Sequence, residues 1–287
     1  MKKMSLHIMG FMMLMMSCTS RDTIVDKTKL LGADYRLFQE TPAWELAKAV
    51  EDGDVEKIRL EISKDKKLVN FRESRFGQPL LILAVYHTNY TSVKTLLEEG
   101  ANPNLQDSYY GDSALMEAAK IGSGTDDLYP KFLKLLLKYG GNPNEEQHGS
   151  MKTRDTPLLI ACSEAKFDYI KILVDAGAKV NLVNEYGICP LYWAMLGVES
   201  HGDPEIITYL IQRGADFRQV LYKTSPGDSP KYITDALRKW RFEIGSSEYK
   251  KKMQIVDFLK INGMDYRKTV IPEQYQKDYP KDYLEKY

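Results

Sequence analysis

Histidines and paired aspartates are the residues in this chain whose types could support metal-dependent or acid–base chemistry. Beyond the N-terminal stretch, His87, His148 and His201 are widely separated in the sequence, whereas a metal site needs ligands that converge. Asp126 and Asp127 could attract a cation, but they lack the alternating acidic pattern of a calcium loop. The chain also lacks a phosphate-binding Gly-Lys-Ser/Thr loop, a Gly-x-Gly-x-x-Gly turn and a His-Glu-x-x-His helix. We therefore expect no metal, no cofactor, no catalytic residue and no enzymatic activity.

Cys18 indicates chemistry of another kind, because of what precedes it. Lys2 and Lys3 stand before an apolar run, Ile8–Met16, and Ser17 directly precedes Cys18. A positive charge followed by a short apolar run is typical of an export signal, and this run is too short to cross a bilayer as a helix. The order resembles a bacterial lipoprotein signal, which implies cleavage before Cys18 and a lipid on its side chain. The alternative is an ordinary secretory signal with an incidental cysteine.

This resemblance implies a domain order and a location. We expect a signal peptide at 1–17, a lipid-anchored tether at 18–40, a folded domain at 41–268 and a C-terminal tail or cap at 269–287. The tether is expected because Thr19–Glu40 is polar and of mixed charge. The expected location is the bacterial cell envelope, facing the periplasm or in the outer membrane, since Thr19 replaces the aspartate that retains lipoproteins in the inner membrane.

The segment Asp155–Asn181 reads as one unit of two short helices and a loop. Thr156 can cap the first helix, Pro157 fits its first position, and Gly177 is placed to end the second in a left-handed turn. Apolar residues recur at helical spacing between these signals. Two helices of this length cannot bury their apolar faces alone, so the unit predicts copies of itself stacked beside it.

The copies are visible, and they resemble the ankyrin repeat. Thr-Pro-Leu opens the reference unit, and the ending Leu-Leu-x-x-Gly-Ala-x-x-Asn occurs in Val93–Asn104, with similar endings in Phe132–Asn144 and Ile206–Asp216. The resemblance implies an all-α solenoid of stacked helix pairs with short β-hairpin-like finger loops. About six repeats fit between 41 and 268, the last degenerate, with helices expected at Tyr232–Phe242 and Met253–Leu259. Two features exceed the repeat: an insertion at Gly122–Tyr129, after which Pro130 should restart a helix, and a long finger at Glu145–Arg154.

The resemblance also implies which residues contact a partner, since these positions flank the finger glycine and follow the Ala-Ala pair of the first helix. An aromatic residue directly precedes the finger glycine at Phe76, Tyr110 and Tyr186. Such rings either bind a partner or pack on neighbouring fingers. The full set of implied protein-binding residues is Phe76, Gln78, Tyr86, His87, Tyr109, Tyr110, Asp112, Lys120, Ser163, Glu164, Glu185, Tyr186 and Ile188.

Charge and cysteine content limit the partners. The chain has 40 basic and 40 acidic residues, and loss of Lys2 and Lys3 with the signal would leave a net charge of −2. Nucleic acid is therefore not expected as the main partner. Cys162 and Cys189 fall at positions of small residues and are expected as packed thiols, with a disulfide as the alternative.

We predict a monomeric module that binds another protein and touches the membrane through its lipid only. A tethered inhibitor or immunity-type protein would be a narrower form of this function. The alternative functions are a small-molecule-sensing protein that uses the insertion and the long finger, and an envelope protein that scaffolds a complex.

Overall fold

The computed structural model describes residues 21–120, 128–151, 153–200, 202–222 and 229–286. The expected signal peptide, the lipidation site Cys18 and most of the insertion Gly122–Tyr129 lie outside these residues. None of the helices formed by the described residues is both long and apolar enough to cross a membrane.

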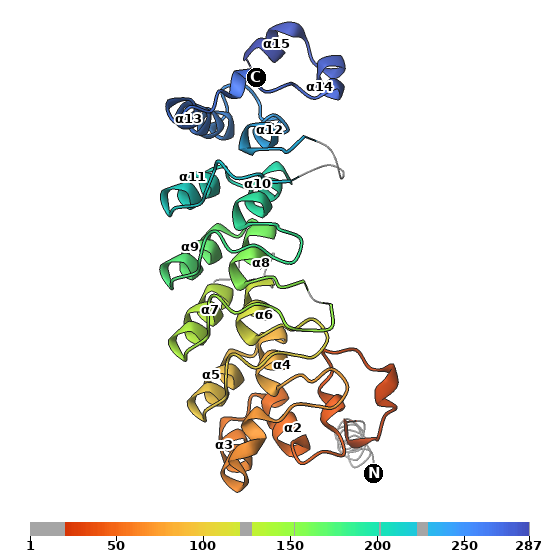
Figure 1. Cartoon of the computed structure of the whole chain (residues 1–287). Helices are drawn as coiled ribbons and strands as arrows, with labels where there is room; N and C mark the ends of the chain where they lie inside the picture. The colour runs from red at the N-terminus through yellow and green to blue at the C-terminus, as the bar shows by residue number, and fades with distance from the viewer. Residues whose placement is uncertain (1–20, 121–127, 152, 201, 223–228, 287) are drawn as a thin grey trace, which may run out of the picture.

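The described residues form an elongated stack of six helix pairs, which confirms the predicted all-α solenoid (Figure 1). The first helices form one column and the second helices form another, each first helix packs on the first helices beside it, and in the first five pairs it also packs on its own second helix. The pairs are α2 (Trp44–Asp52) with α3 (Val55–Lys64), α4 (Leu80–Tyr86) with α5 (Tyr90–Glu98), α6 (Ala114–Lys120) with α7 (Leu128–Lys138), α8 (Pro157–Ser163) with α9 (Phe167–Asp175), α10 (Pro190–Ser200) with α11 (Glu205–Gln212), and α12 (Ile233–Leu237) with α13 (Ser247–Ile261).

Local signals explain why these helices begin and end where they do. In the reference unit, Thr156 accepts a hydrogen bond from the Leu159 amide at 3.3 Å, and Pro157 opens α8. Gly177 has a φ of 91°, as expected for the left-handed turn after α9. Small buried residues such as Ala84, Ala118 and Ala161 let the first helices approach closely.

A ladder of asparagine amides joins each repeat to the next. The Asn144 side chain donates to the Gly177 carbonyl at 3.0 Å and accepts from the Lys179 amide at 2.8 Å. The same pair of bonds occurs at the ends of three other repeats. There the side chains of Asn70, Asn104 and Asn181 each donate to a glycine carbonyl of the next repeat and accept from an amide two residues after that glycine. The asparagine that ends the repeat thus satisfies two backbone groups of its neighbour.

The finger loops contain isolated antiparallel bridges at Arg72–Pro79, Gln106–Ser113 and Tyr222–Lys231 in place of extended hairpins. These bridges are the only β-type pairing within the residues that the structure describes. Cys162 and Cys189 are buried free thiols, as the preferred interpretation expected.

The expected tether is wrong for residues 21–40, which pack onto the first helix pair. This segment contains two short 3₁₀ helices, Lys27–Lys29 and Tyr35–Phe38, and the side chains of Tyr35, Leu37 and Phe38 are buried. The buried Gln39 amide donates to the carbonyls of Arg21 and Thr23, both at 2.9 Å. Three buried apolar side chains and one buried amide therefore help to hold a segment whose overall composition is polar.

The C-terminal end also differs in detail from the expectation. α12 is shorter and α13 longer than predicted, and, in the third pair, α7 begins two residues before Pro130. Two further helices follow, α14 (Glu273–Asp278) and α15 (Lys281–Lys286). Tyr275 is buried, and its hydroxyl donates to the Lys239 carbonyl at 3.4 Å. Of the two alternatives for the tail, the cap is the one observed.

Candidate functional site

The finger loops are held in shape by one polar side chain at the start of each loop. Asp107 accepts hydrogen bonds from the amides of Tyr109 and Tyr110, both at 2.7 Å, and of Asp112 at 3.0 Å. Glu73 and Asn184 bond the amides of their own fingers in the same way. A loop whose amides are satisfied internally presents its side chains outward in a fixed arrangement.

The long finger Glu145–Arg154 packs against the finger before it. The Met151 amide donates to the Tyr109 carbonyl at 3.2 Å, and the backbones of Gly111 and Gly149 touch, since a Cβ on Gly149 would lie 2.2 Å from the Gly111 nitrogen. Glycine is required at this crossing because no side chain fits there. The long finger thus braces the loop that carries Tyr109 and Tyr110.

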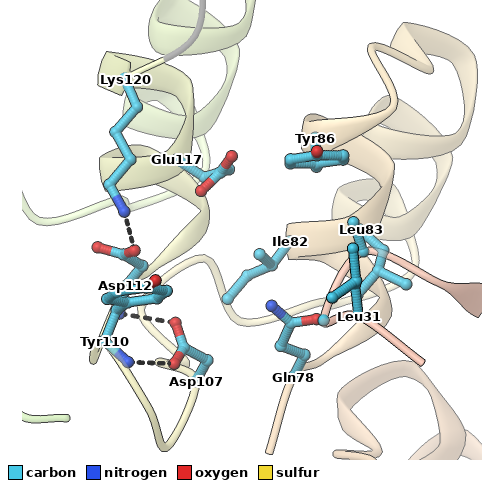
Figure 2. A pocket seen from close by; sticks show the side chains of 12 residues that line it. Leu31, Gln78, Ile82, Leu83, Tyr86, Asp107, Tyr110, Asp112, Glu117 and Lys120 are labelled. Carbon is cyan, nitrogen blue, oxygen red and sulfur yellow. Dashed lines mark hydrogen bonds and ion pairs between the residues drawn. The ribbon is translucent and has the colours of Figure 1, made fainter. Parts of the chain in front are cut away.

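A pocket of about 390 Å³ lies between α4 and α6, on the side of the finger loops (Figure 2). Its two walls differ in chemistry. α4, its finger and the N-terminal segment supply Leu31, Gln78, Ile82, Leu83 and Tyr86, whereas α6 and its finger supply Asp107, Tyr110, Asp112, Glu117 and Lys120. The structure therefore brings together five of the expected binding residues, Gln78, Tyr86, Tyr110, Asp112 and Lys120.

The α6 wall carries three carboxylates and one ammonium. Lys120 forms an ion pair with Asp112, and the other oxygen of Asp112 accepts from the Gln147 amide at 2.6 Å. Lys120 also lies 5.1 Å from the centre of the Tyr110 ring. The Glu117 carboxylate has no hydrogen bond or ion pair among the described residues.

Burial, the largest influence, raises the pKa of Glu117 to about 7; Lys120 opposes this shift, and Asp112 and Asp107 add to it. Glu117 therefore changes charge near neutral pH, unlike an ordinary surface glutamate.

Sequence reasoning missed the other seven lining residues, which are Leu31, Gly32, Ala33, Ile82, Leu83, Asp107 and Glu117. Glu117 could have been found, because the equivalent positions of the second, fourth and fifth repeats hold Leu83, Ile160 and Trp193. A carboxylate at a position that is otherwise apolar is a signal. Leu31 gave none, since it belongs to the segment interpreted as a tether.

The other residues expected around the second and third fingers lie outside this pocket. Phe76 is half-buried beneath the Arg75 guanidinium, 4.7 Å from the ring centre. His87 faces the N-terminal segment, with its Nε2 2.6 Å from the Ala33 carbonyl oxygen and its ring stacked on Tyr35. Tyr109 is exposed and meets the Tyr110 ring edge-on at 4.7 Å. Phe76 and His87 thus make contacts within the chain.

The remaining expected residues fall at two separate places. Ser163 and Glu164 line a shallow hollow beside Trp193, where α8 approaches α10. Glu185, Tyr186 and Ile188 lie on the fifth finger, where Tyr186 is the most exposed of the candidate rings. The thirteen residues therefore do not form a single uninterrupted strip. Within the described ranges, no group of three His, Cys, Asp or Glu residues could hold a metal ion.

Comparison with known proteins agrees with this architecture. Residues 46–146 and 115–220 match the family model described as ankyrin repeats (3 copies). The chain is 28% identical over 184 residues to an ankyrin repeat-containing protein of Treponema pallidum (strain Nichols), covering 64% of this chain and 55% of that relative. It is 30% identical over 142 residues to ankyrin repeat protein L86 of Acanthamoeba polyphaga mimivirus, covering 44% and 24%.

A human protein is similar over a smaller share of its length. The chain is 27% identical over 170 residues to transient receptor potential cation channel subfamily A member 1, covering 58% of this chain and 14% of the channel. The chain thus spans about half the length of the Treponema relative and a quarter or less of the other two.

Proposed function

The chain belongs to the ankyrin-repeat family, and on this premise we propose that the surface formed by α4, α6 and their finger loops binds a segment of another protein. Ankyrin repeats are interaction modules, and their fold is generally non-enzymatic. Stacked repeats offer one extended surface, on which first helices and fingers alternate.

One observation carries this proposal: the finger side of the stack exposes tyrosine rings. The exposed fractions are 50% for Tyr86, 45% for Tyr109, 51% for Tyr110 and 70% for Tyr186. Tyrosine offers a large amphipathic contact area and loses few rotamers on binding, so it is enriched at the centres of protein interfaces. Tyr86 and Tyr110 are the best placed, since both line the pocket.

Capture of a partner with matched variants tests the proposal. The immobilised chain, a Tyr86→Ala/Tyr110→Ala variant and a Leu60→Ala control are exposed to extract of the producing cells. Leu60 is an exposed apolar residue on α3, among the second helices. We expect one protein to be retained by the parent and by the control, and to bind the double variant at least about tenfold more weakly. Equal retention by all three would exclude this surface.

We also propose that Cys18 carries a lipid that anchors the chain in a bacterial envelope, where it acts as a tethered inhibitor. The order of charge, apolar run and Ser17-Cys18 in the sequence supports the anchor. The inhibitor role is motivated by the combination of a rigid repeat scaffold, an anchor and a sequence without a recognised catalytic motif. Cys18→Ser should abolish incorporation of labelled palmitate and release the protein from the membrane fraction. Incorporation that survives this change would contradict the anchor at Cys18.

A further inference from the structure

The pocket between α4 and α6 has an unbalanced charge on one wall. Asp107, Asp112 and Glu117 supply three carboxylates, and Lys120 is the ammonium among the lining residues. Asp107 is occupied by the amides of its own finger, and Asp112 by Lys120 and Gln147. Glu117 is therefore the carboxylate that can accept hydrogen bonds from a cationic ligand.

The opposite wall can hold the apolar and planar parts of such a ligand. Tyr86 projects from α4 across the gap from Glu117, above Ile82 and Leu83 (Figure 2). Lys120 already lies near the Tyr110 ring, which leaves the half-exposed Tyr86 as the ring available to an incoming cation. Gln78 lines the same wall, and its amide oxygen is buried without a hydrogen-bond partner among the described residues.

We propose that this pocket receives an arginine side chain of the bound protein segment, with the guanidinium between Tyr86 and Glu117. This inference rests on the proposed protein-binding function. A guanidinium is planar, so it can stack on a ring and donate two parallel hydrogen bonds to a carboxylate at once, which an ammonium cannot do. Its aliphatic stem would lie along Leu31 and Ile82. A volume of about 390 Å³ lies at the lower end of the roughly 300–1,000 Å³ range of ligand pockets, which suits one long side chain.

Binding should depend on pH because the ligand needs the ionised form of Glu117. The charged and titratable groups around Glu117 are Lys120 on α6, Asp107, Tyr110 and Asp112 on the finger, and Tyr86 on α4. With a pKa of about 7, the glutamate is mostly protonated at pH 6 and mostly ionised at pH 8. The affinity for a guanidinium should therefore rise several-fold between these two pH values.

An NMR titration with two blocked peptides tests the inference on the full chain. The probes are acetyl-Gly-Gly-Arg-Gly-Gly-amide and the same peptide with citrulline, which has the shape of arginine without its charge. At pH 8 we expect the arginine peptide to bind at least fivefold more tightly than the citrulline peptide. Its binding should shift the amide signals of Tyr86, Glu117 and Lys120. Glu117→Gln should weaken it about tenfold, whereas Glu56→Gln, on the exposed face of α3, should leave it unchanged.

Several results would overturn the inference. These are equal binding of the two peptides, arginine binding that is unchanged by Glu117→Gln, equal binding of a third peptide with lysine in place of arginine, or no binding of any peptide. The proposed function fails separately. If the peptides do not bind but the Tyr86→Ala/Tyr110→Ala variant still loses the captured partner, protein binding stands and only the arginine site falls.

Discussion

At the scale of single residues, Glu117 gives the clearest departure from a plain repeat. Its pKa of about 7 lies above the ordinary value of 4.5, so the folded chain holds the proton more tightly than the unfolded chain. The free energy of unfolding contributed by this group therefore falls as pH rises from about 4.5 to 7. A half-buried charge is retained here at a cost to stability, as is common in binding sites.

The predicted loss of stability with rising pH can be tested with Glu117→Gln. At pH 8 the variant should have a free energy of unfolding about 2 kcal/mol higher than the parent, because the buried charge is gone. At pH 4, where the parent glutamate is neutral, the two should differ little. Urea unfolding at both pH values measures this difference. An equal difference at pH 4 and pH 8 would show that burial of the charge is not the cause.

The asparagine ladder predicts the effect of a second substitution. Asn144→Ala removes two hydrogen bonds between the third and fourth repeats and should lower the free energy of unfolding by about 1–2 kcal/mol. Asn102→Ala is the control, because the Asn102 side chain bonds the Asn104 amide in its own loop. Urea unfolding of both variants compares the two losses. If they are equal, the ladder adds nothing beyond ordinary loop capping.

At the scale of elements, the segment 21–40 acts as part of the folded domain. It covers α2 at the open end of the stack, as terminal capping elements do in solenoids, and it also supplies Leu31 to the pocket. The Arg21 guanidinium donates to Asp52 at 2.7 Å, so packing extends to the first described residue. The segment predicted as a tether thus caps one end of the stack.

A core substitution tests this role. Phe38 has no exposed surface, and Phe38→Ala should lower the free energy of unfolding by about 3–5 kcal/mol. Ile24→Ala should have almost no effect, since 68% of that side chain is exposed. Thermal unfolding of both variants makes the comparison. A Phe38→Ala variant as stable as the parent would mean that the segment is detached in solution.

The elements also show what could be predicted from the sequence. The central helix pairs were predictable because Thr156, Pro157 and Gly177 mark the helix boundaries of the reference unit, and a similar sequence pattern recurs in the other repeats. The packing of segment 21–40 was not predictable, since its few apolar residues do not recur at helical spacing. The sixth pair had lost its markers, so its helices were predicted with wrong lengths.

The pocket was predictable only in part. Gln78, Tyr86, Tyr110, Asp112 and Lys120 occupy positions that the repeat assigns to contacts. His87 occupies such a position too, but its ring contacts Ala33 and Tyr35 of a segment distant in sequence. Which contact positions stay free depends on tertiary packing outside the repeat, and no repeat pattern contains that information.

At the scale of the whole molecule, the chain is an elongated stack with a cap at each end and the pocket near its N-terminal end (Figure 1). Only Thr19 and Ser20 separate Cys18 in sequence from the first described residue, Arg21, which bonds Asp52. A lipid on Cys18 would therefore hold this end close to the membrane surface, so we expect a partner at or near that surface. The binding surface and the proposed anchor would then act at the same end of the molecule.

A site-specific photo-crosslink tests the binding surface most directly. Benzoylphenylalanine is introduced at Tyr110, beside the pocket, and in a second variant at Leu60 on α3, and both are irradiated in the producing cells. Our account predicts one crosslinked protein from position 110 that is absent from position 60. A crosslinked protein from position 60 alone would contradict it, because the partner would then bind the second helices and not the finger side.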